Sequence, residues 1–130
     1  MVNRLRTAIV DWLSGVSRPA PGQTANFSVK LGALEIGTLA FDGEQWVFSY
    51  STAFKNQTTI KPITAFPDVN KEYRQADLWP FFLLRIPSTE QPEVKRYIEQ
   101  HTDEEPDEVD MLRQFGRRSA SNPFELLPAA

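Results

Sequence analysis

The chain has 130 residues, a formal net charge of −3 and no cysteine. That length supports one domain with its own hydrophobic core, and the lack of cysteine excludes disulfides, thiolate metal sites and cysteine nucleophiles and fits the cytoplasm. No stretch reaches the roughly 20 apolar residues of a membrane span, and Asp11 interrupts the apolar N-terminus, so we expect a protein that is neither secreted nor membrane-spanning.

Residues 1–16 are predicted to form a short amphipathic helix. Their apolar residues recur at spacings of three, four and seven, which is typical of one helix face; they are Val2, Leu5, Ile9, Trp12, Leu13 and Val16. Residues 17–26, rich in proline and glycine, predict a flexible linker. The helix could dock on a membrane surface, on a partner or on its own domain, and the pattern leaves these alternatives open.

From Phe27 the apolar period changes to two, which predicts β-strands. Gly32-Ala33 and Asp42-Gly43 separate three alternating runs, so we predict a three-stranded antiparallel meander. The Asp-Gly pair favours a type I′ turn, with positive φ at both central residues. The third strand has three aromatic residues on one face that are expected to be core: Trp46, Phe48 and Tyr50.

Residues 52–76 look irregular, with one short edge strand predicted within residues 58–66. The next segment, residues 77–87 (DLWPFFLLRIP), is apolar almost all round. We predict a helix there that is capped by Asp77, tolerates Pro80 in its first turn and ends at Pro87.

Two further helices are predicted at residues 90–100 and 104–115, the second capped by Asp103 and ended by Gly116. Their buried residues are expected to be Val94, Tyr97, Ile98, Val109, Leu112 and Phe115. A last strand is predicted at residues 124–127. The fold class is therefore α+β, with a small antiparallel sheet and about three short helices in a domain at residues 27–130.

The chain shows no convincing catalytic, cofactor or metal motif. GALEIGT at residues 32–38 has P-loop-like glycines without the lysine. His101 is the one histidine, so a hydrolase or transferase centred on it, or a metal site with Asp103, is less favoured than a polar surface residue. The acidic stretch at residues 90–110 argues against direct nucleic-acid binding, because such binding needs clustered Lys and Arg side chains. The pair Arg117 and Arg118 does not supply such a cluster by itself.

Three stretches carry a resemblance to a known family: VKLGALEIGTLAFDGEQWVFSY at residues 29–50, LWPFFLLRIP at 78–87 and DMLRQFGRRSASNPFELLP at 110–128. Together, residues 26–128 resemble the N-terminal subdomain of the HipA-family serine/threonine kinases, the toxins of bacterial toxin–antitoxin modules. The chain departs from the family pattern at four places, which are Ser88, Thr89, Arg118 and Asn122-Pro123.

The resemblance implies a regulatory protein. The family's nucleotide-binding and catalytic parts lie beyond this subdomain, and no such pattern occurs in the 130 residues, so we expect no enzyme activity. In split systems of the family, a free-standing subdomain accompanies a shortened HipA-like kinase and a helix-turn-helix DNA-binding protein. That implies an antitoxin that binds and neutralises the kinase; the alternative is a structural subunit that bridges kinase and DNA-binding protein without inhibition.

Aromatic residues are the expected partner contacts, because aromatic anchors dominate interface energetics. The helical period over residues 77–87 turns Trp79, Phe82 and Ile86 outward and Phe81 and Leu84 under the sheet. We therefore predict a partner-binding set of Tyr73, Trp79, Phe82 and Ile86. The alternative is that these aromatic residues are simply core.

Overall fold

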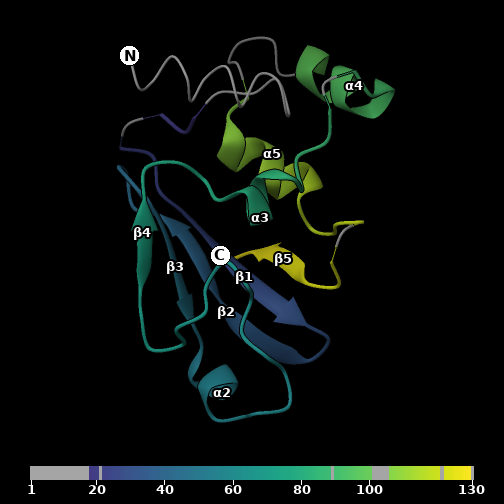
Figure 1. The fold of residues 1–130 in the computed structure, drawn as a ribbon. Helices are drawn as coiled ribbons and strands as arrows, with labels where there is room; N and C mark the ends of the chain where they lie inside the picture. Colours follow the sequence, from purple (N-terminus) through teal and green to yellow (C-terminus); the bar gives the residue numbers. More distant parts are fainter. Residues whose placement is uncertain (1–17, 21, 89, 101–105, 121, 130) are drawn as a thin grey trace.

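The computed structural model describes residues 18–20, 22–88, 90–100, 106–120 and 122–129. Over these residues the chain has an α+β fold with one antiparallel sheet, as the sequence predicts (Figure 1). The predicted helix at residues 1–16, His101 and Asp103 lie outside the described residues.

The sheet has the strand order β4-β3-β2-β1-β5 within the described part of the chain. The strands are β1 (Ala25–Leu31), β2 (Leu34–Phe41), β3 (Trp46–Tyr50), β4 (Tyr73–Gln75) and β5 (Glu125–Pro128). The predicted meander and the predicted late strand are confirmed. β1 begins inside the segment predicted as a linker, β4 was not predicted, and the edge strand predicted at residues 58–66 is wrong because that segment is a loop.

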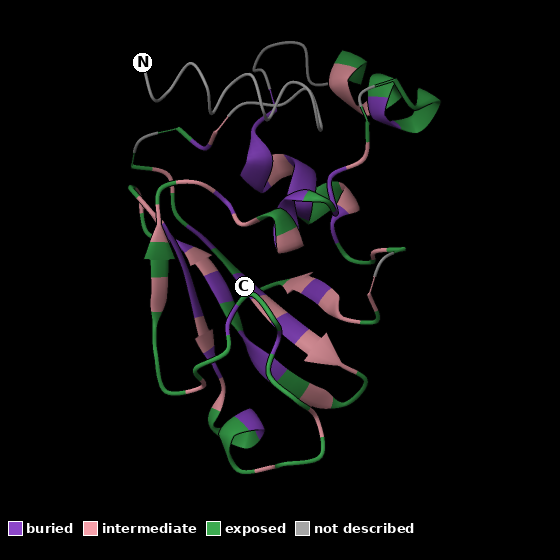
Figure 2. Cartoon of the chain, in the orientation of Figure 1, coloured by how far each residue is buried: buried purple, intermediate pink, exposed green. Residues whose placement is uncertain are grey.

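The sheet has a covered face and an open face. Cross-strand partners share a face, and the register aligns Phe27, Leu39 and Phe48 on the covered face. The next positions, Ser28, Thr38 and Ser49, share the open face. Figure 2 shows buried positions alternating with less buried ones along β1, whereas β3 is buried at four of its five positions.

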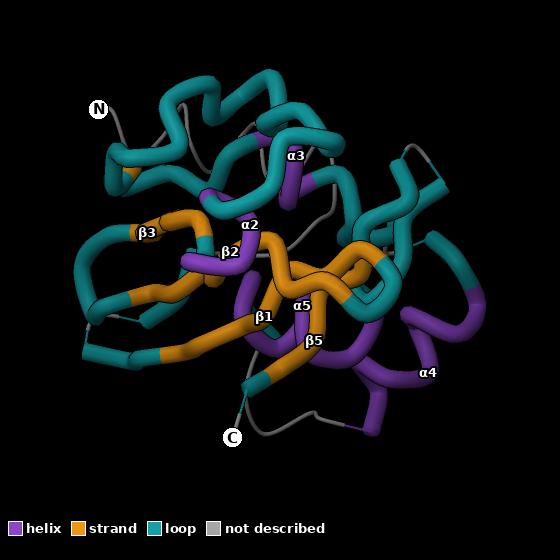
Figure 3. Tube along the Cα trace, turned by 90° about the horizontal axis from the view of Figure 1, so that it is seen from below, coloured by secondary structure: helices purple, strands orange, loops and turns teal. Residues whose placement is uncertain are grey.

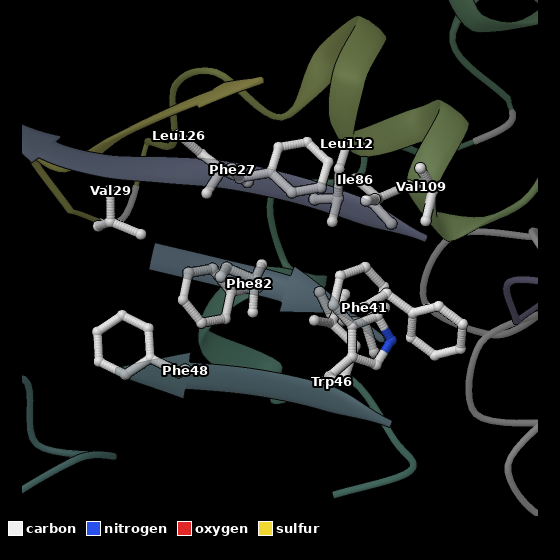
Figure 4. Close-up of a cluster of buried hydrophobic side chains, with 14 of the residues drawn as sticks. Phe27, Val29, Phe41, Trp46, Phe48, Phe82, Ile86, Val109, Leu112 and Leu126 are labelled. Atoms are coloured by element: carbon white, nitrogen blue, oxygen red, sulfur yellow. The ribbon is translucent and has the colours of Figure 1, made fainter. Parts of the chain in front are cut away.

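The helices of the described residues are α2 (Thr52–Lys55), α3 (Pro80–Leu83), α4 (Pro92–Gln100) and α5 (Glu108–Phe115). The segment around α3 and helix α5 supply the cover of the sheet, and Figure 3 shows the long loops around α3 from a second side. Figure 4 shows Phe82 and Ile86 from the α3 segment, with Leu112 from α5, among the buried side chains of the strands. None of the described helices has the length and apolar content that crossing a bilayer requires.

The turn at Asp42-Gly43 differs from the prediction. Gly43 has a φ of 108°, but no described residue other than glycine has positive φ, so a type I′ turn is wrong. Instead, Asp42 Oδ1 accepts hydrogen bonds from the backbone N–H groups of Gln45 (2.8 Å) and Glu44 (2.9 Å). These two hydrogen bonds lower the pKa of the Asp42 carboxyl. They also stabilise the turn through a side chain.

The helix predicted over residues 77–87 is a single turn. α3 starts after Trp79, which has no side-chain capping bond, so the predicted cap at Asp77 is wrong. Leu84 ends the turn as its C-cap residue, and Arg85, which follows it, is buried.

The two later helices are present but begin later than predicted. α4 begins at Pro92, and the predicted start of α5 at residue 104 with Asp103 as its cap is wrong. Asp107 caps α5 in a reciprocal pair with Asp110, and Gly116 ends it as predicted. Of the six predicted buried residues, Val94, Val109 and Leu112 are buried, whereas Tyr97, Ile98 and Phe115 are half-buried.

Candidate partner-binding surface

A cluster of aromatic rings surrounds Phe66, which lies in the loop between α2 and β4 and is fully buried. We call this group the Phe66 cluster. Its rings lie 4.3 to 6.4 Å from Phe66 between centroids and belong to Phe48, Tyr73, Trp79, Phe81 and Phe82. The cluster joins the sheet to the α3 segment, so its outer members occupy fixed positions at the surface.

The loop that carries Phe66 is fixed by Tyr50. The Tyr50 hydroxyl donates a hydrogen bond to the Phe66 carbonyl oxygen (2.6 Å) and accepts one from the Ile63 N–H (2.9 Å). Burial of this side chain raises the pKa of Tyr50 to about 12. The sequence predicted Tyr50 as a core residue, which is confirmed, but it gave no signal for the role of the hydroxyl.

Tyr73 and Trp79, two of the four predicted contact residues, are brought together by Phe66. Both are half-buried and pack edge-on against the Phe66 ring, at 5.1 Å and 5.0 Å. The Tyr73 hydroxyl also accepts a hydrogen bond from the Asp68 N–H at 2.8 Å, and Lys71 Nζ lies 5.1 Å from the centre of its ring. Each ring therefore has one face or edge held by the domain and another left accessible.

Phe82 and Ile86, the other two predicted contact residues, are core residues. Their exposed fractions are 0% and 4%, and Phe82 packs against Phe48, whereas Leu84 is 58% exposed. The predicted outward orientation of Phe82 and Ile86 is thus wrong, as is the predicted burial of Leu84. The physical reason is that α3 lasts for one turn, so a helical period does not extend over residues 77–87.

Phe81 forms an accessible groove with a distant part of the chain, which the sequence did not predict. The Phe81 ring lies 5.9 Å from the ring of Phe124, just before β5. The hollow beside them has a volume of about 530 Å³, and we call it the Phe81 groove. It is lined by Lys61, Pro62, Ile63, Thr64, Ala65, Phe81 and Phe124. No local sequence signal joins these three segments.

Arg85 connects the α3 segment to the chain after α5. Arg85 is 4% exposed, and its guanidinium group donates hydrogen bonds to Asn122 Oδ1 (2.7 Å) and to the carbonyl oxygens of Phe124 (2.7 Å), Gly116 (3.2 Å) and Arg117 (3.3 Å). Burial lowers the pKa of Arg85 to about 10, which leaves it protonated at neutral pH. This cation is therefore balanced by oxygen dipoles of the backbone and of one amide.

A second hollow of about 320 Å³ shares Phe124 with the Phe81 groove as a lining residue. Its lining residues are Arg118, Ser119, Asn122, Pro123, Phe124 and Glu125. Glu125 Oε2 lies 3.1 Å from Arg117 Nε and 3.9 Å from Arg118 Nε. Within the described ranges, no group of three or more His, Cys, Asp and Glu side chains is placed to hold a metal ion.

The family model of the HipA N-terminal domain matches residues 27–121. The chain belongs to the HipA N-terminal domain family. This finding confirms the resemblance carried by the three stretches described above. A comparison with curated proteins gave no significant match.

The structure explains two residues of this HipA N-terminal domain. A Cβ atom at Gly37, in the Ile-Gly-x-Leu stretch of β2, would clash with the carbonyl oxygen of Ser49 on β3. Glycine is therefore required for close pairing of the strands at this point. Asn122, where the chain departs from the family pattern, accepts hydrogen bonds from Arg85 and from the Phe124 N–H, so this departure has a structural role here.

Proposed function

We propose that this HipA N-terminal domain is a non-catalytic, antitoxin-type regulatory subunit that binds and neutralises a HipA-like serine/threonine kinase in the bacterial cytoplasm. The observation that carries the proposal is the family match over residues 27–121. A helix-turn-helix DNA-binding protein is a further candidate member of the complex. The expectation from the sequence that the chain is not an enzyme forms part of the same proposal.

The surface of the domain supports a role in binding a protein. Tyr73, Trp79 and Phe81 are aromatic residues that the domain encloses only in part, and Leu84, which ends the α3 turn, is exposed. Large apolar side chains gathered at a surface are typical of interaction sites. Aromatic side chains held rigidly by their own domain lose little entropy on binding and serve well as anchors.

In this proposal the rim formed by Tyr73, Trp79 and Phe81 faces the kinase. Trp79 is the candidate for the side chain that lies near the kinase active site and holds the enzyme inactive. Its ring is supported by Phe66 at 5.0 Å and by Phe82 at 6.5 Å, which fixes its direction. Tyr73, which packs against the same Phe66 ring at 5.1 Å, then serves as a second anchor.

The test is coexpression of the full chain with the HipA-like kinase of the source organism, with bacterial growth and complex formation measured together. We expect the wild-type chain to copurify with the kinase and to restore growth. We expect Trp79→Ala to restore growth less well, while circular dichroism shows that the variant remains folded. Growth arrest that persists although the complex forms would contradict the antitoxin role and favour the alternative of an assembly subunit that bridges kinase and DNA-binding protein.

A further inference from the structure

We infer that the Phe81 groove is a docking seat for an apolar side chain carried on an acidic segment of the partner protein. The identity of that partner as a HipA-like kinase rests on the proposed function. The groove itself rests on residues that lie apart from the predicted contact set, namely the loop at residues 61–65, Phe81 and Phe124.

The lining of the groove is mainly apolar. Its walls combine two aromatic rings with proline, isoleucine and alanine side chains, and Thr64 and Ala65 are exposed at its opening. A volume of about 530 Å³ falls within the range of about 300 to 1,000 Å³ that is usual for binding pockets. The groove is thus large enough for a bulky apolar side chain and chemically suited to it.

Both walls of the groove are held in place before any partner binds. Tyr50 fixes the loop wall through its hydrogen bonds to Ile63 and Phe66. Arg85 fixes the opposite wall, because it donates to the Phe124 carbonyl oxygen and lies 5.9 Å from the centre of the Phe81 ring. A site that is already ordered avoids the entropy cost of arranging its side chains on binding.

Leu84 extends the apolar surface beyond the groove. Residues three apart on a helical turn are neighbours on the same side, so Leu84 lies on the side of α3 that also carries Phe81. Leu84 is 58% exposed, and among the described residues it is the one large hydrophobic residue that is exposed to this degree. A partner segment seated in the groove would cover it as well.

The charges around the groove favour an acidic partner segment. Lys61 is the charged residue among those that line the groove. In the adjacent hollow, which shares Phe124 with the groove, the carboxylate of Glu125 lies 3.1 Å from Arg117 Nε and 3.9 Å from Arg118 Nε, so two guanidinium groups share one carboxylate. The groove therefore has one cationic side chain, Lys61, and the two arginines outnumber the carboxylate that they share, so opposite charges on a partner would be complementary.

A peptide titration tests the groove without the kinase. The full chain, labelled with ¹⁵N, is titrated with acetyl-Glu-Asp-Phe-Leu-Glu-Asp-amide and with the basic counterpart in which lysine replaces each acidic residue. We expect the acidic peptide at millimolar concentration to shift the amide resonances of Thr64, Ala65 and Leu84, with little change at Ser49 on the open face. Absence of these shifts, or equal shifts with the basic peptide, would overturn the inference.

A charge series at Thr64 tests whether the groove is used in the complex. Kinase made catalytically inactive is immobilised, and the dissociation constants of Thr64→Glu and Thr64→Lys are measured by interferometry. We expect Thr64→Glu to weaken binding at least about tenfold, because it places like charge against an acidic segment, and Thr64→Lys to keep wild-type affinity within about twofold.

Thr59→Glu is the matched control, because Thr59 is exposed in the same loop and does not line the groove. If wild-type protein binds and Thr64→Glu binds no more weakly than Thr59→Glu, the groove inference is wrong while the proposed function stands. If the wild-type protein does not bind the kinase, the proposed function fails, and the peptide titration alone decides whether the groove accepts acidic segments.

Discussion

The two faces of the sheet differ in the chemistry and the solvent exposure of their side chains. On the covered face, Phe27, Leu39 and Phe48 are 0% exposed beneath α5 and the α3 segment. On the open face, short polar side chains bond to one another, with Ser28 Oγ donating to Glu35 Oε2 (2.7 Å) and the hydroxyl oxygens of Thr38 and Ser49 3.4 Å apart. The open face therefore needs no protein cover.

The aromatic layer on the covered face, by contrast, is not fully enclosed by the domain. The layer reaches the surface at Tyr73, Trp79 and Phe81, on the sides of the Phe66 cluster. In the proposed function, a partner therefore docks at the edge of the covered layer and not on the open sheet face. The predictions below test this difference, from the largest effect to the smallest.

Phe48→Ala is expected to have the largest effect on stability. Phe48 is fully buried and its ring contacts those of Tyr50, Phe66 and Phe82. Removal of such a side chain costs about 3 to 5 kcal/mol through lost burial and the cavity that remains. Urea unfolding measures this cost, and a loss under about 1 kcal/mol would mean that the covered face is not the core.

Arg85→Ala is expected to rank next. The change leaves the buried carbonyl oxygen of residue 116 and the part-buried carbonyl oxygens of residues 117 and 124 without this donor. Each buried group left without a partner costs about 1 to 3 kcal/mol, so we expect a total loss of about 3 kcal/mol. Arg85→Lys should recover only part of the loss, because an ammonium group cannot reproduce the guanidinium geometry. The control is Arg74→Ala on the exposed edge strand, which should leave the urea midpoint nearly unchanged. Equal midpoints for the Arg85 and Arg74 variants would contradict the structural role of Arg85.

Tyr50→Phe is expected to lower the free energy of unfolding by about 1 to 3 kcal/mol, since the Ile63 N–H and the Phe66 carbonyl lose their shared partner.

Tyr50 also predicts that the stability of the protein depends on pH. Burial raises the pKa of Tyr50 from 10.0 to about 12, so the folded protein keeps a phenol proton that the unfolded chain releases. This contribution to stability is complete below pH 10 and is lost as the pH rises from 10 to about 12. Urea midpoints at about pH 9 and about pH 11 should therefore differ less in Tyr50→Phe than in the wild type, and equal differences would contradict the assignment.

Thr38→Ala on the open face is expected to have the smallest effect. Thr38 is exposed, and its hydroxyl contacts only Ser49 at 3.4 Å among the hydrogen bonds of the described residues. Substitutions at such positions usually change stability by less than about 0.5 kcal/mol. A loss of stability comparable to that of Phe48→Ala would show that the open face is covered in solution, and would contradict the difference between the two faces.

The sequence predicted the meander well, because alternation on strands of five to eight residues is a strong local signal. It did not predict β4, which has three residues and therefore too short a pattern. The turn at Asp42-Gly43 was located correctly, but its type was wrong because the Asp42 carboxylate replaces the expected backbone geometry.

The candidate surface was predicted only in part. Trp79 and Tyr73 were chosen as aromatic residues in an apolar region, and both remain partly accessible. Phe82 and Ile86 were misplaced because a helical period was applied to a segment that turns only once. The Phe81 groove depends on contacts between residues 61–65, 81 and 124, and no local pattern reveals contacts over such separations.

The most direct test of the central claim compares one charge at the edge of the covered layer with the same charge on the open face. Leu84→Glu and Ser49→Glu are each measured for binding to the catalytically inactive kinase, after urea unfolding has shown that both variants are folded. Leu84 is exposed at the end of the turn that carries Phe81, whereas Ser49 lies on the open face. We predict that Leu84→Glu weakens binding at least about tenfold and that Ser49→Glu leaves it unchanged within about twofold. Loss of binding in Ser49→Glu with full binding in Leu84→Glu would contradict the account.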